Sequence, residues 1–311
     1  MRTKSLKCAA AGIALILASS GAMAADPASC QKVRLSDVGW TDIQVTTGVA
    51  FVLLEALGYQ PEMTQLTVPV TFSALKENDM DVFLGNWMPA QTDAIKDYAA
   101  DGSVETVAQN LEGAGFGLVV PDYVTAEGVK GLADLGAQAE KFGGKIYGIE
   151  AGAAGNNIIR DMMADPKNNL SGFELVESSE AGMLTEAEQA MKAKSWIVFL
   201  GWTPHPVMGE MKINYLDGMQ SSGFGGAKVF TVSRKGYSAE CPNVGAFLKN
   251  LKFDMSAENV MMDKVIKGGN PNEVAKEWLK ANPDAVTPWL AGVTTFDGGD
   301  GAAAVKAALG S

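Results

Sequence analysis

Short apolar runs alternate along the chain with longer stretches in which apolar residues recur at helical spacing. Such alternation predicts an α/β fold with parallel-rich sheets flanked by helices. The apolar runs predict strands at residues 33–38, 63–68, 81–85, 116–120, 145–149, 174–177, 197–201, 212–216 and 227–232. Helical spacing predicts helices at residues 42–57, 71–78, 90–100, 127–140, 155–164, 180–194, 242–250, 256–267, 272–281 and 302–309.

The order of these elements predicts two domains, one of them discontinuous. The Gly113-Ala114-Gly115 segment interrupts the first strand–helix series, and the last hundred residues become nearly all helical. We therefore expect residues 25–112 plus 212–311 to form domain one, with residues 113–211 inserted as domain two. Two crossings between the domains would form a hinge, and hinged lobes close on ligands.

The N-terminus has the pattern of a signal peptide. A basic start is followed by a short apolar stretch and by an Ala-Met-Ala sequence that ends at Ala24. This pattern predicts cleavage of residues 1–24, a mature chain that begins at Ala25, and export to the periplasm. The apolar stretch is too short for a membrane anchor.

Two cysteines remain after the predicted cleavage, because Cys8 leaves with the signal peptide. Cys30 and Cys241 are expected to form one disulfide in an exported protein. Two free thiols are the alternative.

The chain is acidic, with a formal net charge of −11. Loss of three basic residues with the signal peptide leaves 22 basic against 36 acidic residues, a net charge of −14. This charge argues against nucleic acid or an anionic membrane surface as a partner. It is compatible with a cationic ligand, although solubility explains it equally well.

Three segments share one design, an apolar run that leads through a glycine to a tryptophan. They end at Trp40, Trp87 and Trp202. In open α/β sheets the carboxyl ends of the strands face the ligand. Several indoles around one cleft suit a quaternary ammonium cation. The alternative for these tryptophans is packing, which we expect for Trp196, Trp278 and Trp289.

Two polar residues near these tryptophans have open roles. Asp42 follows Trp40 by two residues, so that Thr41 or Asp42 is expected to cap the helix, while Asp42 can also accept a hydrogen bond from a ligand. The only histidine, His205, lacks the partners of a metal site or of a nucleophile–base pair. A structural or hinge role is expected for it, with a hydrogen bond to ligand as the alternative. No phosphate-binding or dinucleotide motif occurs, so we expect no cofactor, no metal and no enzymatic activity.

Six motifs resemble the periplasmic choline- and betaine-binding proteins of ABC importers, most closely the choline-binding members. The resemblance covers essentially the whole mature chain. The motifs are Ser36-Asp37-Val38-Gly39-Trp40-Thr41-Asp42, Val82-Phe83-Leu84-Gly85-Asn86-Trp87-Met88-Pro89, Tyr147-Gly148-Ile149-Glu150, Val176-Glu177-Ser178-Ser179-Glu180, Phe199-Leu200-Gly201-Trp202-Thr203-Pro204-His205-Pro206 and Glu240-Cys241-Pro242-Asn243.

This resemblance implies a two-lobed type II periplasmic binding protein with an aromatic box for a trimethylammonium group. It places Trp40, Trp87 and Trp202 on three walls of the box and Asp42 at the choline hydroxyl. Two positions depart from the choline-binding pattern. The fourth wall, a tyrosine in choline binders, is Phe116, and a ligand-binding asparagine is replaced by Ala153. Asn156, three residues further on, is a second candidate for that contact.

The resemblance implies choline as the first candidate ligand. Glycine betaine or another betaine-type osmolyte, or trimethylamine N-oxide, is the alternative. The implied partner is an ABC transporter permease, a chemoreceptor partner stays open, and a monomer is expected. An exported enzyme acting on choline is a separate class, which would need a nucleophile–base pair or a metal cluster that the motifs do not supply.

Overall fold

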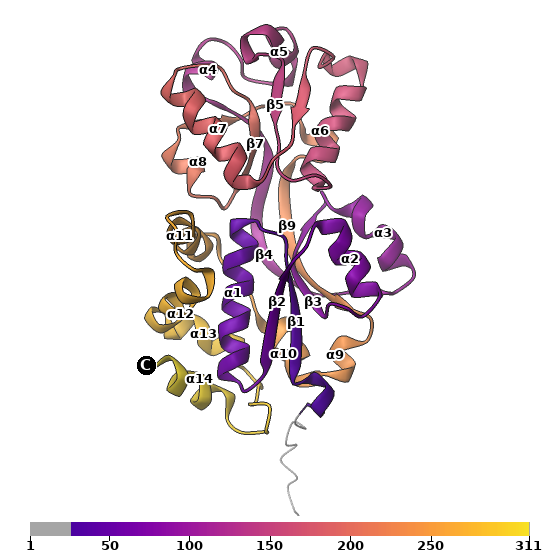
Figure 1. Cartoon of the computed structure of the whole chain (residues 1–311), viewed down its shortest axis with the longest axis vertical. Coiled ribbons are helices and arrows are strands. Elements are labelled where there is room, and N and C mark those ends of the chain that lie inside the picture. The colour runs from indigo at the N-terminus through magenta and orange to yellow at the C-terminus, as the bar shows by residue number, and fades with distance from the viewer. Residues whose placement is uncertain (1–25, 311) are drawn as a thin grey trace, which may run out of the picture.

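The computed structural model describes residues 26–310, and the predicted signal peptide and Cys8 lie outside this range. Two lobes lie one above the other along the longest axis (Figure 1). The strands β4 (Val104–Pro121) and β9 (Gly225–Arg234) run through the join between them. Within the described range, no helix is both long and apolar enough to span a membrane.

Nine strands of the described range form one sheet that continues through both lobes. Their order is β2-β1-β3-β9-β4-β7-β5-β6, with β8 paired to β4. Pairing is parallel among β1, β2 and β3 and among β5, β6 and β7, whereas β9 is antiparallel to β3 and β4. The remaining strands are β1 (Lys32–Asp37), β2 (Gln60–Gln65), β3 (Val82–Met88), β5 (Lys145–Tyr147), β6 (Glu174–Val176), β7 (Phe199–Thr203) and β8 (Ile213–Tyr215).

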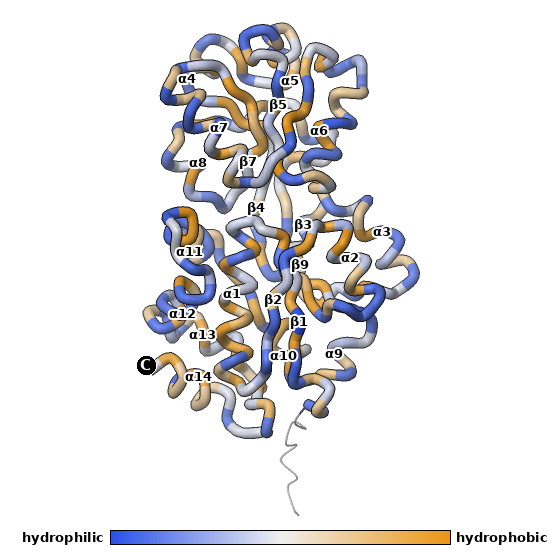
Figure 2. Tube along the Cα trace, viewed as in Figure 1, coloured by the Kyte–Doolittle hydropathy of each residue, from blue (hydrophilic) through white to orange (hydrophobic). Residues whose placement is uncertain are grey.

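The lower lobe is built around β1 and β3, which are buried because helices cover them. Helix α1 is buried along most of its length and packs against β1, α11, α12 and α14. Apolar residues follow the central strands of both lobes and helix α1 (Figure 2). The helices here are α1 (Thr41–Ala56), α2 (Val68–Lys76), α3 (Thr92–Ala100), α9 (Tyr237–Glu240), α10 (Pro242–Asn250), α11 (Met255–Ile266), α12 (Pro271–Ala281), α13 (Pro283–Trp289) and α14 (Gly301–Leu309).

The upper lobe holds β5, β6 and β7. Helices surround β5 and β7 there (Figure 1). Its helices are α4 (Asp122–Ala126), α5 (Leu132–Gly136), α6 (Ala154–Ala164), α7 (Glu180–Lys192) and α8 (Val207–Glu210). The single helix predicted over residues 127–140 is wrong, since the segment forms α5 and a 3-10 turn, with α4 before them. Gly128 takes a positive φ of +105°, and the backbone of Gly131 forms a bridge with Asp217, so no continuous helix can pass there.

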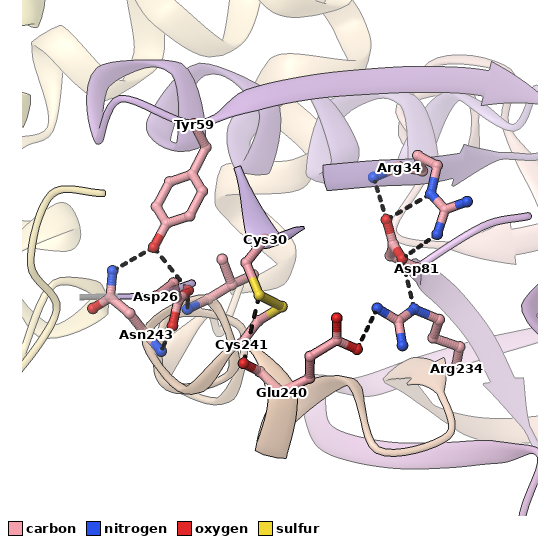
Figure 3. The surroundings of a disulfide bond; sticks show 10 residues. Asp26, Cys30, Arg34, Tyr59, Asp81, Arg234, Glu240, Cys241 and Asn243 are labelled. Carbon is pink, nitrogen blue, oxygen red and sulfur yellow. Dashed lines mark hydrogen bonds and ion pairs between the residues drawn. A yellow bond between two sulfur atoms is a disulfide. The ribbon is translucent and has the colours of Figure 1, made fainter. Parts of the chain in front are cut away.

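The predicted disulfide is present and joins Cys30 to Cys241 with their Cα atoms 5.6 Å apart. Figure 3 shows Asp26 beside it, accepting a hydrogen bond from the hydroxyl of Tyr59 at 2.9 Å and another from the backbone of Asn243 at 2.8 Å. The start of the described chain is therefore fastened to the first turn of α10 at the base of the lower lobe.

The segment after residue 211, the predicted domain boundary, keeps contacts with the upper end of β4. Strand β8 pairs with Val119–Pro121 at the upper end of β4, and the ring of Phe224 packs on Phe116 with centroids 5.1 Å apart. We therefore propose that the return crossing comes after Tyr215 and that domain two extends further than residue 211.

Candidate ligand-binding site

A cavity lies where the two lobes meet, and residues of both lobes line it. Most of the lining is aromatic or aliphatic, and no lysine or arginine contributes to it. The lining residues are Trp40, Asp42, Trp87, Ala90, Gln91, Phe116, Ile149, Ala154, Gly155, Leu200 and Trp202.

The three predicted indoles meet in this cavity, at or just beyond the carboxyl ends of their strands, as expected. Trp87 and Trp202 are the penultimate residues of β3 and β7, and Trp40 lies in the turn between β1 and α1. Gly39 has a φ of +81°, a conformation that residues with a Cβ rarely adopt, so the turn that presents Trp40 favours glycine. Cis peptide bonds to Pro89 and Pro204 follow two of the tryptophans closely.

Phe116 completes the aromatic lining between the lobes. It lies opposite Trp202 in the antiparallel pairing of β4 with β7. Its ring meets that of Trp87 edge to face, with centroids 6.2 Å apart. Phe224, which the sequence did not single out, packs behind it. The wall at Phe116 is therefore held by aromatic neighbours and has no hydroxyl.

Among the residues that the structure describes, Asp42 is the only ionisable one at the cavity lining. Its side chain is 1% exposed, and Oδ2 accepts a hydrogen bond from Nε1 of Trp87 at 3.1 Å. Oδ1 has no partner among the described residues. Burial, and then the negative charge of Glu180, raise the pKa of Asp42 to about 8 against the opposing effect of the Trp87 hydrogen bond.

The expected capping of helix α1 by Thr41 or Asp42 is wrong. Trp40 is the N-cap residue and makes no side-chain capping bond. The carboxylate of Glu180, which comes from the upper lobe, accepts hydrogen bonds from the backbone N–H of Thr41 at 2.8 Å and from its hydroxyl at 2.6 Å. Asp42 is therefore free of the helix end and faces the cavity.

A second contact between the lobes involves Trp40. Its Nε1 lies 3.0 Å from both carboxylate oxygens of Glu150. Glu150 is partly buried, and this burial raises the pKa of its carboxyl group. The indole is thus fixed by the upper lobe although it belongs to the lower one.

Three residues predicted as ligand contacts do not line the cavity. Ala153 is buried, and its neighbours Ala154 and Gly155 take the place at the lining. The amide of Asn156 is occupied by the backbone, since Oδ1 accepts from Ile149 N at 3.1 Å and Nδ2 donates to Ile149 O at 2.8 Å. Asn156 therefore shapes the loop that carries Ile149.

His205 is also covered by protein. Its ring packs edge to face on Trp202, with centroids 4.9 Å apart, and its Nε2 lies 3.0 Å from Oε1 of Glu180. This geometry supports the expected structural role of His205 rather than the alternative, a hydrogen bond to ligand.

Gln91 is a polar residue of the lining that no sequence motif had indicated. Its Nε2 donates to the carbonyl oxygen of Gly85 at 2.9 Å, while its Oε1 has no partner among the described residues. Its position in the turn that follows Trp87 was the available signal. Glu150 and Glu180 occur in the motifs quoted above, but their contact with the opposite lobe is visible only in three dimensions.

A further buried carboxyl group lies close behind the site. Glu258 of α11 is 2% exposed, and burial followed by the negative charge of Asp42 raises its pKa well above the usual value. Asp42 therefore has two acidic neighbours, Glu180 and Glu258, and no lysine or arginine lies among the described residues that line the cavity.

The described residues hold one group with metal-ligand spacing, namely Cys30, Glu240 and Cys241. Both cysteines are joined in the disulfide, so their sulfur atoms are not available as thiolate ligands.

Comparison with known proteins places this geometry in a family. Residues 31–281 match the family model described as the substrate binding domain of ABC-type glycine betaine transport system, OpuAC. One similar solved structure is an ABC-transporter choline binding protein in complex with choline. Its sequence is 50% identical to this chain, the match covers 91% of this chain and 100% of that protein, and the TM-score is 0.90. This likeness confirms the predicted two-lobed α/β fold.

The names of two further similar proteins include glycine betaine. Lactococcal OpuAC in its closed-liganded conformation with glycine betaine is 27% identical, covers 83% of this chain and 98% of its own, and has a TM-score of 0.76. The glycine betaine/carnitine transport binding protein GbuC of Listeria monocytogenes is 35% identical over 169 residues, which are 53% of this chain and 54% of that protein. The predicted resemblance is confirmed. The chain belongs to the family of substrate-binding domains of ABC-type glycine betaine transport systems, whose members bind substrates for transport and are not enzymes.

Proposed function

We propose that this protein captures a quaternary ammonium compound, with choline as the first candidate, in the cavity between its lobes and delivers it to an ABC permease. One observation carries this proposal. A fully buried carboxylate with a free oxygen, Asp42 Oδ1, lines a cavity walled by Trp40, Trp87 and Trp202.

The lining fits a methylated cation for two reasons. Aromatic faces attract a cation that cannot donate hydrogen bonds, with about 0.5–2 kcal/mol for each contact. A positive ligand also favours the ionised form of the buried Asp42 carboxyl, which has no basic residue beside it in the lining.

Choline satisfies Asp42 directly, because its hydroxyl donates a hydrogen bond to a carboxylate oxygen. The choline-bound relative at 50% identity supports this order of candidates. Phe116 and Ala153 lack the polar atoms that the choline-binding pattern has at these positions, so fewer contacts hold the polar end of the ligand.

Glycine betaine is the second candidate, with the betaine-bound relative in its favour. A pKa of about 8 keeps Asp42 largely protonated at pH 7, and a protonated carboxyl can donate to the carboxylate of betaine. Trimethylamine N-oxide is the third candidate, because it is smaller and needs fewer polar contacts.

The family and the N-terminal sequence pattern support the proposals for partner and location. We propose export to the periplasm with cleavage after Ala24, action as a monomer, and docking to a permease. The intact mass of protein recovered from the periplasm tests the cleavage, since a chain beginning elsewhere than Ala25 contradicts it.

Calorimetric titration of refolded, ligand-stripped protein tests the ligand assignment. We expect choline to bind more tightly than glycine betaine and trimethylamine N-oxide. Tetramethylammonium serves as a control ligand, because it keeps the cation and lacks the hydroxyl. Absence of heat with all four compounds would contradict the proposal.

Asp42→Asn is the matched variant for this titration. It keeps the size of the side chain and removes its charge, so we expect choline affinity to fall by roughly tenfold or more, the scale of a charged hydrogen bond. Glycine betaine should lose less. Equal losses for both ligands would show that Asp42 does not select for the hydroxyl.

A further inference from the structure

We propose that Glu180 is a positioning residue that couples closure of the two lobes to assembly of the aromatic cavity, without touching the ligand. This inference rests on the proposed function, since it concerns the same cavity. Glu180 does not line the cavity, yet its carboxylate reaches residues next to the cavity walls of both lobes.

Glu180 is available for this role because another residue caps its own helix. It is the first residue of α7, and the hydroxyl of Ser179 accepts the hydrogen bond from Gly182 N at 3.1 Å that caps this helix. The carboxylate of Glu180 is 5% exposed and extends across the join to the other lobe.

On the lower lobe, Glu180 takes the place of a cap for α1. The N–H and the hydroxyl of Thr41 both donate to it. A carboxylate is favoured at a helix N-terminus, where it accepts from unpaired N–H groups and interacts with the helix dipole. Thr41 lies between Trp40 and Asp42, so this contact fixes the turn that carries both residues.

On the upper lobe, Glu180 orients His205. The backbone N–H of Val207 donates to Nδ1 of His205 at 3.3 Å, which leaves the ring proton on Nε2. Nε2 then donates to Glu180 Oε1 at 3.0 Å. The histidine ring packs against Trp202, so the carboxylate is connected to a cavity wall from the upper lobe as well.

All three groups that meet Glu180 are therefore hydrogen-bond donors. When the lobes separate, the carboxylate loses both Thr41 contacts together, and the cavity loses its lower walls at the same time. The Thr41 contacts therefore stabilise the closed arrangement, whereas the contact with His205 stays within the upper lobe when the lobes separate.

Glu180→Gln gives the sharpest test. Glutamine keeps the size of the side chain but places an NH₂ donor where Thr41 and His205 also donate, so the hydrogen bonds cannot all form. Glu186→Gln on the exposed face of the same helix is the control. We expect Glu180→Gln to weaken choline binding by at least tenfold, through faster dissociation in stopped-flow tryptophan fluorescence. The thermal midpoint of the protein without added ligand should stay close to that of Glu186→Gln.

A distance measurement separates this role from a general structural one. Spin labels at the exposed positions Ala99 of α3 and Ala133 of α5 report the separation of the lobes. At saturating choline, we expect the wild-type protein to show one short distance between the two labels. Glu180→Gln should show an additional longer distance, from molecules in which the lobes are apart. Wild-type dissociation rate and wild-type distances in Glu180→Gln would overturn the inference.

The same measurement distinguishes the two proposals from each other. If wild type binds none of the tested ammonium compounds, the proposed function fails. The label distances of the protein without ligand then still decide the role of Glu180, because an unchanged distribution in Glu180→Gln rejects it and a shift to longer distances supports it.

Discussion

Two buried aspartates in the lower lobe have opposite surroundings. Asp81 is 2% exposed and receives hydrogen bonds from two guanidinium groups, Arg34 at 2.7 and 2.9 Å and Arg234 at 2.7 Å (Figure 3). Asp42 is 1% exposed and receives one hydrogen bond, from the indole of Trp87.

Their pKa values diverge for this reason. Burial alone would raise the pKa of Asp81, but the hydrogen bonds from Arg34 and Arg234 outweigh it and hold the pKa below the usual value. Burial raises the pKa of Asp42 to about 8, because no cation offsets it. The protein therefore contains the counter-ion of Asp81, whereas the counter-ion of Asp42 is expected to arrive as ligand.

The largest expected effect separates the two aspartates by stability. Asp81→Asn leaves two arginines without their shared partner, so we expect the free energy of unfolding to fall by about 3–5 kcal/mol. Asp42→Asn removes a buried group that has no ionic partner and should not lower stability. Urea denaturation at pH 7 checks both variants, and an equal loss in the two would remove the distinction.

The next effect concerns the wall beside Asp42. Trp87→Ala opens the cavity and should weaken choline binding at least tenfold with the fold retained. Trp87→Phe keeps an aromatic face, although it removes the indole donor to Asp42 and part of the ring area, so its loss should be smaller than that of Trp87→Ala. Calorimetry measures both affinities, and wild-type affinity in Trp87→Ala would show that Trp87 only packs.

The pH dependence of binding follows from the raised pKa of Asp42. A cation favours the ionised carboxyl, so binding releases a proton wherever free Asp42 is protonated. Choline affinity should therefore rise with pH between 6 and 8, by less than tenfold for each unit, and level off above about 8. Asp42→Asn should flatten this profile. A persistent slope in that variant would assign the titration to Glu150 or Glu258 instead.

The smallest effect concerns the wall across from Trp202. Phe116→Tyr restores the hydroxyl of the choline-binding pattern without removing the aromatic face. We expect choline affinity to increase by less than tenfold, the upper limit for one neutral hydrogen bond. Titration against tetramethylammonium is the control. A gain for this control ligand equal to that for choline would show that the hydroxyl does not contact the polar end of the ligand.

Local sequence predicted most of the strands and helices, because their apolar periodicity agrees with their final burial. The α1 segment is an example, since the expected helix at 42–57 corresponds to Thr41–Ala56. The helix expected at 127–140 failed because bridge formation between Gly131 and Asp217, far apart in the chain, breaks it. Gly39, Trp40 and Asp42 were likewise readable as one motif, since they lie on one turn.

The roles of other residues needed tertiary structure. Asn156 and His205 are polar residues beside the cavity. Only the structure shows that Asn156 hydrogen-bonds to the backbone and that His205 hydrogen-bonds to Glu180. Gln91 was missed because a single glutamine in a turn has no distinguishing pattern. The capping of α1 could not be predicted either, because its cap lies 139 residues away in the other lobe.

The amino-acid sequence by itself determined the α/β elements, the disulfide partners and the tryptophans that line the cavity, because each depends on local periodicity or on residue type. The tertiary structure decided which carboxylates meet cations and which do not. That distinction depends on distances and burial between segments far apart in the chain, and it separates the structural Asp81 from the ligand-facing Asp42.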